Sequence, residues 1–288
     1  MWLPADQEQK GLAFPGMIKT KTAYGIDLAG YRGGRTGFAR AQRSKSGILV
    51  TVYRNTPLSR KLKGESLIEP TLTAELEFLG RCLQTGVLVV DIPIDLQQLA
   101  PSRIVKYVWE LTQRPVDRAF SGLRPLADRI GSPVARFRHL LSRLPNALPP
   151  LAGRRIYESY PAASLQVLGI PHSGYKGSIS MQQNGWGGAE PLCIVAKSLC
   201  LAADCGEKLS DDQMDAIICA LAGVSTDREL LHGDDLRARI RATLTEKMGV
   251  ADVDARSFEP PEAYMLLRSP PTSNIRVTVR DYNGNFDR

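Results

Sequence analysis

A short run of apolar residues, Val87 to Val90, constrains the fold of this chain most strongly. The run is continuous and rich in β-branched residues, and it is followed by Asp91 and closed by Pro93. Such a run is typical of a central strand that is covered on both faces. Leucines at helical spacing predict a helix over 70–84, directly before it. A helix that leads into a buried strand indicates an α/β fold with right-handed crossovers between parallel strands.

An earlier strand also contains an aspartate near its end. In the stretch YGIDLAG, residues 24–30, alternation places the large apolar side chains on one face and Asp27, among small residues, on the other. A buried aspartate is costly unless something pairs with it. Two further strands, predicted over 37–42 and 48–54, would extend this one into a meander.

Two later segments carry further carboxylates. Residues 154–160, RRIYESY, indicate a strand that contains Glu158. A helix predicted over 210–223 places Asp212 and Asp215 on one face, because they lie three residues apart. Asp215 is the better ligand candidate, since Asp212 in the first turn also suits the helix N-terminus as a simple stabilising charge. Small residues further along this helix would let it lie close against a sheet.

The remaining segments carry weaker signals. They predict helices over 161–168, 190–205 and 237–248, a strand over 275–279, and a loop over the glycine-rich residues 174–188.

Positive charge is concentrated in one part of the chain. The whole protein carries a net charge of +7, and residues 101–155 alone contain eleven basic and three acidic side chains. A one-sided, arginine-rich segment suggests a polyanionic partner, most often nucleic acid, although a solvated helical surface is the alternative. We expect the nucleic-acid contacts to come from Arg32, Arg35, Arg114, Arg118, Arg136, Arg138, Arg154 and Arg155.

Several classes of protein are disfavoured by the composition. Hydrophobic residues make up 43% and charged residues 23% of the chain, as in an ordinary soluble protein. No secretory signal is visible, and the longest apolar runs are too short to span a bilayer, so we expect a cytoplasmic protein that does not enter membranes. The five cysteines form no CxxC pair and the three histidines lack zinc-ligand spacing, which argues against disulfides and structural zinc.

The order of these motifs resembles the RNase H-like superfamily, and in particular a prokaryotic family of RNase H-fold nucleases inferred from sequence, a domain of unknown function. The pair Tyr175-Lys176 is also similar to that family. The resemblance covers about residues 23–223, apart from the basic insertion, and rests on GIDLAG with Asp27, VVDIPI with Asp91, YESYPAAS with Glu158, and DDQMDAIICALAG with Asp215.

This resemblance implies an α/β fold with a mixed five-stranded sheet flanked by helices. The expected organisation is an N-terminal arm (1–20), an RNase H-like domain (21–248) that contains a basic helical insertion (101–150), and a C-terminal extension (249–288).

The same resemblance implies a nuclease that uses two Mg²⁺ or Mn²⁺ ions. Asp27, Asp91, Glu158 and Asp215 would be the catalytic ligands, with Asp212 as a further ligand, while Lys176 would orient water or contact the scissile phosphate. The physical chemistry agrees, because carboxylates about 4 Å apart repel by about 4 kcal/mol at an effective dielectric constant of about 20. Converging acids therefore hold protons or bind cations, and oxygen ligands favour hard ions.

Alternatives remain for the protein and for single residues. The chain could be a catalytically silent nucleic-acid-binding or complex-forming protein on the same scaffold. It could also be an actin-like ATPase or sugar kinase, which would need a second phosphate-binding turn, with Gly185 to Gly188 as the only candidate. Asp91 could simply cap a turn, and Glu158 could pair with Arg154 or Arg155.

Overall fold

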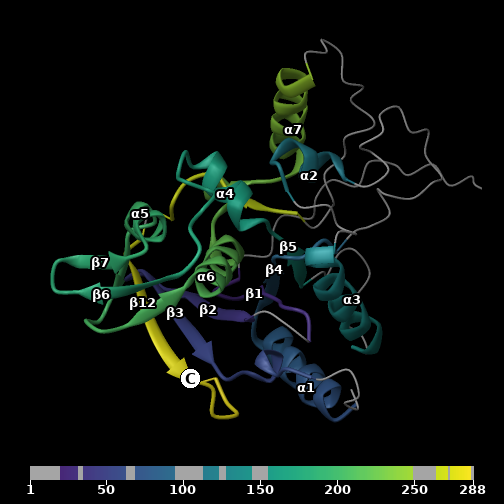
Figure 1. The fold of residues 1–288 in the computed structure, drawn as a ribbon, viewed down its shortest axis with the longest axis vertical. Coiled ribbons are helices and arrows are strands. Elements are labelled where there is room, and N and C mark those ends of the chain that lie inside the picture. The colour runs from purple at the N-terminus through teal and green to yellow at the C-terminus, as the bar shows by residue number, and fades with distance from the viewer. Residues whose placement is uncertain are drawn as a thin grey trace, which may run out of the picture.

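The central sheet organises the molecule (Figure 1). Within the described residues of this computed structural model, seven strands pair in the order β5-β4-β1-β2-β3-β12-β8. Helices pack on both faces of the sheet, which confirms the predicted mixed α/β fold, although the sheet is larger than the five strands expected. The structure describes residues 20–31, 35–62, 69–94, 113–122, 128–144, 155–248, 264–271 and 273–286.

The sheet combines an antiparallel meander with parallel neighbours. β1, β2 and β3 pair antiparallel, while β4 and β5 continue parallel to β1 on one side and β12 and β8 parallel to β3 on the other. The strands are β1 (Thr22–Asp27), β2 (Gly37–Arg43), β3 (Ile48–Arg54), β4 (Val87–Val90), β5 (Ile156–Glu158), β8 (Leu201–Ala203) and β12 (Ile275–Asp281).

Strand alternation divides the sheet into two packed faces. One face carries Ala23, Val89 and other mostly small side chains, and it packs against α5 (Glu190–Ser198) and α6 (Asp211–Val224). The opposite face carries Tyr24, Phe38 and Val90, and it packs against α1 (Glu69–Thr85) and α3 (Asp128–Arg143). The predicted separation of Tyr24 and its large neighbours from the Asp27 face is thus confirmed.

A smaller apolar cluster lies beyond the β5 edge, among elements that Figure 1 shows on that side of the sheet. The cluster is built by α2 (Pro115–Ala119), α4 (Pro161–Val167), α7 (Gly233–Met248), β10 (Leu230–Leu231) and β11 (Leu266–Leu267).

The predicted basic insertion is described in part. Its described residues include the helices α2 and α3, whereas Arg32, Arg154 and most of the predicted arm lie outside the described residues. None of the helices in the described parts of the chain is long and apolar enough to cross a membrane.

Two predictions from the later half of the chain were wrong. The predicted loop over 174–188 contains a hairpin of β6 (Ser178–Gln182) and β7 (Gly185–Gly188), extended by β9 (Lys208–Ser210). The segment is rich in glycine and polar residues, which suggested a loop, but two of its apolar side chains, Ile179 and Trp186, are buried.

The helix predicted over 190–205 instead ends at Ser198. Cys200 adopts a left-handed backbone conformation with φ of 55°, which stops the helix and turns the chain into β8.

The last described strand enters the interior of the sheet. β12 comes from the segment expected to be a C-terminal extension, yet it pairs parallel with β3 along its whole length and with β8 on its other side. Beyond it, Tyr282 and Phe286 pack onto the aromatic side chains of Phe38 and Phe78. This segment is therefore part of the main core.

The closest contact between the layers joins α6 to the meander. A side chain at Gly25 on β1 would overlap the backbone of α6 at Ala216 and Ala220, and one at Gly37 on β2 would overlap the carbonyl oxygen of Asp212. The predicted close approach of this helix is confirmed, but the residues that make it, Ala216, Ala220 and Gly223, each lie one position after the expected Asp215 face of the helix. The contact fixes the N-terminal half of α6 against the end of β1, where Asp27 lies.

Substitution of Gly25 tests this contact. We expect Gly25→Ala to lower the free energy of unfolding by about 3 kcal/mol or more, because backbone atoms on both sides must move. The matched control is Gly80→Ala on α1, where nothing lies within 4 Å of the new methyl group and helix propensity improves by about 1 kcal/mol. Chemical denaturation of both variants measures the difference, and equal stability of the two would contradict the contact.

Candidate functional site

Asp27 and Asp91 follow the same edge of neighbouring parallel strands. Ile26 on β1 lies opposite Val90 on β4, so the residues that follow them occupy equivalent positions. The backbone N–H of Asp91 donates a hydrogen bond of 2.9 Å to the carbonyl oxygen of Ile26, which fixes this register. The two aspartates therefore meet at one end of the sheet, as their positions in the sequence predicted.

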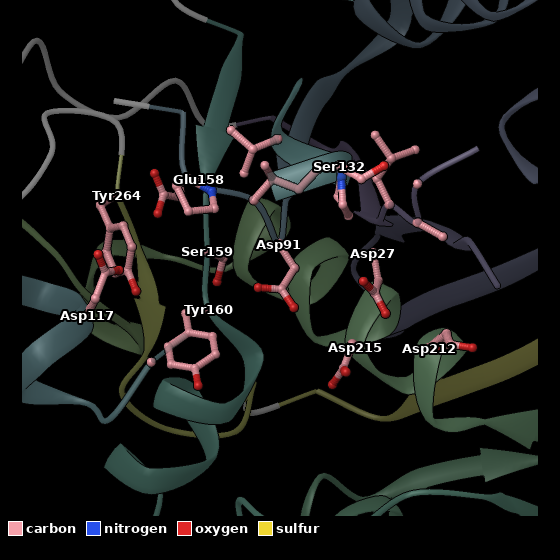
Figure 2. Close-up of a pocket in the computed structure, with 18 of the residues that line it drawn as sticks. Asp27, Asp91, Asp117, Ser132, Glu158, Ser159, Tyr160, Asp212, Asp215 and Tyr264 are labelled. Carbon is pink, nitrogen blue, oxygen red and sulfur yellow. The ribbon is translucent and has the colours of Figure 1, made fainter. Parts of the chain in front are cut away.

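Asp215 reaches the same place from the other layer. It lies on α6, one turn after Asp212, and Figure 2 shows its side chain below those of Asp27 and Asp91, facing the same space. The phenol of Tyr175 donates a hydrogen bond of 2.8 Å to Asp215 Oδ1, and both side chains are buried. The sequence places Tyr175 beside the candidate Lys176, but nothing in it indicates this contact with Asp215.

The electrostatics of these three carboxyl groups are unfavourable in their ionised form. Burial raises the pKa of Asp27 well above its ordinary value, and the carboxylates of Asp215 and Asp91 raise it further. Burial and the charge of Asp215 likewise raise the pKa of Asp91. The pKa of Asp215 is raised to about 7, mainly by burial, although the Tyr175 hydrogen bond acts in the opposite direction. Asp27 and Asp91 keep some exposed surface towards a cavity, but protein atoms surround them on the other sides.

Two cations border this acidic group. The Lys176 ammonium lies 3.0 Å from Asp211 Oδ2 and remains 75% exposed, so it is at the rim and pairs with an acid that was not a ligand candidate. Burial raises the pKa of Asp212, whereas Lys176 and Arg35 act in the opposite direction, which places both cations near this carboxylate. Asp212 itself is half-buried at the start of α6.

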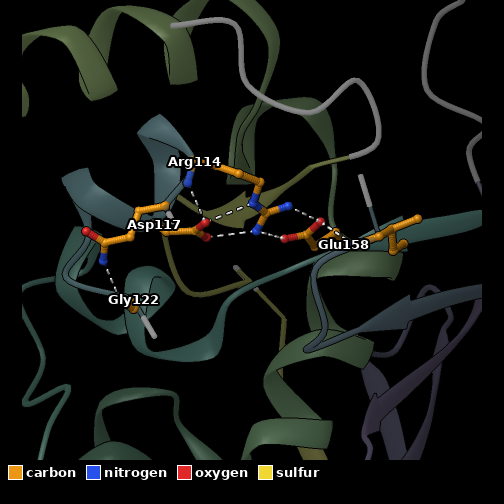
Figure 3. Close-up of polar contacts among 6 residues, drawn as sticks. Arg114, Asp117, Gly122 and Glu158 are labelled. Atoms are coloured by element: carbon orange, nitrogen blue, oxygen red, sulfur yellow. Dashed lines mark hydrogen bonds and ion pairs between the residues drawn. The ribbon is translucent and has the colours of Figure 1, made fainter. Parts of the chain in front are cut away.

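Glu158 does not join the three aspartates. It lies opposite Val90 in the β4–β5 register, one residue before the position equivalent to Asp91. Alternation therefore turns its side chain towards the other face, where Arg114 donates hydrogen bonds of 2.6 and 2.9 Å to its two carboxylate oxygens (Figure 3). The Ile94 N–H donates a third bond of 2.9 Å. Glu158 thus pairs with an arginine, as the alternative interpretation held, but with Arg114 rather than Arg154 or Arg155.

Arg114 has a structural role instead of the predicted nucleic-acid contact. Its side chain is 1% exposed, and its guanidinium also binds Asp117, with hydrogen bonds of 2.8 and 2.9 Å. One arginine therefore neutralises part of the charge of two buried acids and joins α2 to β5. Four guanidinium N–H groups bond these two acids and the side chain is buried, which corrects the prediction of a phosphate contact for this residue.

Arg136 is likewise buried and internally bonded. It pairs with the fully buried Glu75 on α1 and donates hydrogen bonds of 2.6 and 2.8 Å to the carbonyl oxygens of Ala29 and Leu58. Its guanidinium also stacks 4.2 Å from the centre of the Tyr31 ring. Arg136 therefore fastens α3 to the chain that follows β1. Its buried guanidinium cannot make the predicted contact with nucleic acid.

The other predicted arginines that the structure describes lie at the surface. Arg155 donates a hydrogen bond of 2.6 Å to the Leu83 carbonyl oxygen, which occupies part of its guanidinium. The exposed set comprises Arg35, Arg118, Arg138 and Arg155.

A cavity of about 550 Å³ joins the acidic group to its surroundings. Its walls come from the ends of β1, β4 and β5, from α3 and from the start of α6, as Figure 2 shows for the labelled residues. Among the described residues, however, no three His, Cys, Asp or Glu side chains are gathered closely enough to hold a metal ion. The carboxylates share a cavity without forming a ready-made ligand set.

Removing Arg114 tests the buried ion-pair network. We expect Arg114→Met to lower the free energy of unfolding by about 3–5 kcal/mol, because two buried carboxylates lose their cation. The exposed Arg138→Met on the neighbouring insertion helix is the control, with an expected change within about 0.5 kcal/mol. Urea unfolding compares them, and an unchanged stability of Arg114→Met would contradict the structural role.

The raised carboxyl pKa values predict a pH-dependent stability difference. The folded protein holds protons on these groups at a pH where the unfolded chain, with an ordinary aspartate pKa of 3.8, has lost them. This stabilisation is complete below about pH 4; for Asp215 it is lost as the pH rises through about 7, and for Asp27 and Asp91 as the pH rises through their own raised pKa values. We therefore expect Asp27→Asn to unfold at a higher temperature than wild type at pH 8, with the difference shrinking towards pH 4.

Thermal unfolding across this pH range, without added metal, gives the measurement. The exposed Asp204→Asn is the matched control and should follow wild type at every pH. A lower unfolding temperature for Asp27→Asn at pH 8 would show that Asp27 is instead stabilised by an unseen partner.

Comparison with known proteins places the chain in a family without assigning an activity. No curated protein and no solved structure matches the chain. A family model described as a protein of unknown function, DUF429, matches residues 25–235, which include all three converging aspartates, Tyr175 and Lys176. That match spans most of the sequence, so the chain belongs to the DUF429 family.

Proposed function

We propose that this protein is a divalent-metal-dependent nuclease that hydrolyses phosphodiester bonds in DNA or RNA. The observation that carries the proposal is the convergence of Asp27, Asp91 and Asp215 from two layers on one cavity. Burial raises the pKa of each of them and neighbouring carboxylates raise it further, which is an energetic cost that a stable fold does not need. Perturbed acids in a cleft are typical of functional sites.

Cation binding would relieve this cost. Oxygen ligands favour hard ions, and we propose two Mg²⁺ or Mn²⁺ ions held by Asp27, Asp91 and Asp215, with Asp212 at the edge. The described carboxylates do not yet form a ligand set, and a bound cation would relieve the repulsion that opposes their closer approach. Glu158 is not one of the proposed ligands, because it pairs with Arg114. Its contribution is structural, since this pair joins α2 to β5.

The chain's own side chains divide the remaining tasks. Tyr175 holds Asp215 in one orientation through its hydrogen bond. Lys176 and Arg35, at the exposed rim, attract and orient the phosphate backbone, in a salt-sensitive and sequence-independent manner. When bound, Mg²⁺ or Mn²⁺ ions would stabilise the attacking water and the leaving oxygen of a phosphodiester.

The strand order supports an RNase H-like assignment. The segment β5-β4-β1-β2-β3 combines an antiparallel meander with two parallel strands, entered through α1, and α6 delivers a carboxylate to the end of β1. The resemblance implies a mixed five-stranded sheet flanked by helices, and these five strands fit that description. We propose that β12 and β8 are additions to that core.

One observation favours a second candidate, a catalytically silent nucleic-acid-binding protein. Among the described residues no metal-holding group is assembled, and the exposed Arg118 and Arg138 remain available for a backbone contact. The ATPase or sugar-kinase alternative loses its support, because Gly185–Gly188 forms the strand β7 rather than a phosphate-binding turn.

Cleavage assays test the nuclease. Wild type, Asp27→Asn and the control Asp204→Asn are incubated with single- and double-stranded DNA, RNA, hybrids and branched substrates, each with Mg²⁺ or Mn²⁺. We expect metal-dependent cleavage by wild type and by the control, and a rate at least about 100-fold lower for Asp27→Asn, since loss of a ligand removes transition-state stabilisation. Absence of cleavage by wild type on every substrate, with binding retained, would favour the silent binder.

A further inference from the structure

Ser159 completes the row of residues that Asp27 and Asp91 begin. Val90 lies opposite both Ile26 and Glu158, so the next residues on the three parallel strands occupy equivalent positions. The backbone N–H of Ser159 donates a hydrogen bond of 3.0 Å to the Val90 carbonyl oxygen, which fixes this register. The residue that stands beside Asp91 on the third strand is therefore a serine, not the glutamate one position earlier.

The Ser159 hydroxyl is buried without a hydrogen-bond partner. The residue is 1% exposed, and its Oγ makes no hydrogen bond within the part of the chain that the structure describes. It nevertheless lines the cavity, and Figure 2 shows it between Asp91 and Tyr160. Buried hydroxyl groups nearly always have a partner, and an unsatisfied one costs about 1–3 kcal/mol. A polar group left unpaired in a cavity wall indicates a ligand atom at that point.

The charge around Ser159 limits what this ligand atom can be. Asp91 lies beside Ser159 on the neighbouring strand, and Arg114, which also lines the cavity, is already bound to Asp117 and Glu158. The cations Lys176 and Arg35 lie instead beside Asp212. A phosphate group suits the cationic rim, whereas the Ser159 end suits a neutral group that can both donate and accept a hydrogen bond.

We propose that Ser159 is a substrate-positioning residue whose hydroxyl bonds a sugar hydroxyl of the bound nucleic-acid strand. This inference rests on the proposed nuclease and adds the part of the nucleotide that the β5 end of the cavity recognises. Two sugar hydroxyls have this chemistry: the 2′-hydroxyl of an RNA strand and the 3′-hydroxyl at the end of a strand. The first would make the protein selective for RNA, and the second would make it act from strand ends.

The test compares substrates that differ in which sugar hydroxyl they carry. RNA with a 3′-deoxy end, DNA with a free 3′-hydroxyl, and DNA with a 3′-deoxy end, all of one sequence, are bound to Asp27→Asn and to Asp27→Asn/Ser159→Ala, and binding is measured by fluorescence anisotropy. KM and kcat are measured with wild type and Ser159→Ala. We expect Ser159→Ala to weaken affinity and raise KM about 5- to 10-fold for one hydroxyl-bearing strand only, which is the effect of one hydrogen bond.

Ser164 offers a matched control. It is also a buried serine, but its hydroxyl accepts a hydrogen bond of 3.2 Å from the Leu267 N–H. Ser164→Ala should lower the unfolding temperature and leave KM unchanged. Ser159→Ala should keep or raise the unfolding temperature of the free protein, because it removes an unpaired group.

The outcomes separate this inference from the proposed function. If wild type discriminates between the strands, Ser159→Ala abolishes this discrimination and wild type cleaves none of them, the sugar subsite is supported and the nuclease is overturned. Cleavage by wild type that is equal in Ser159→Ala, or a loss that is the same for all strands, overturns the subsite alone. A lower unfolding temperature for Ser159→Ala would show a structural role, and absence of binding to any strand overturns both.

Discussion

The close contact between α6 and the meander determines where the candidate site forms. Gly25 and Gly37 let the helix backbone rest directly on β1 and β2, without side chains between them. Asp215 is carried on that helix and Asp27 on the strand beneath it, so the packing of the two layers sets the arrangement of the acids. The carboxylates are therefore held together by backbone contact across the layers, and not by any attraction between themselves.

The protein treats its buried acids in two different ways. Glu75, Asp117 and Glu158 each pair with an internal arginine, and these pairs fasten the helices of the basic segment to the core. Within the part of the chain that the structure describes, no arginine pairs with Asp27 or Asp91, while Asp215 accepts a hydrogen bond from Tyr175 and lies near the charge of Lys176. Since burial of an unpaired charge is costly, this difference between the two groups supports the function proposed for the second.

Strand ends and helix faces in the sequence predicted that the three aspartates would converge, because strand register and helical period are local properties. The prediction that Glu158 joins them differs from the structure, because its contacts depend on a one-residue difference in register and on Arg114, which lies 44 residues away in the sequence. The basic segment was interpreted from composition, which cannot tell a surface arginine from one, such as Arg136, that faces a buried acid. The hairpin of β6 and β7 was missed because only two buried side chains define its inner face.

The position of β12 has a consequence for how the chain reaches its native state. Residues 275–281 form the strand that separates β3 from β8, so the sheet stays divided until this late segment has been synthesised. During translation β3 would present an open edge, and open edges invite pairing with other chains. Because β12 contacts residues more than 200 positions earlier, closure of the sheet is a slow, non-local step. On the ribosome, the acidic end of β1 can therefore assemble well before the far side of the sheet is closed.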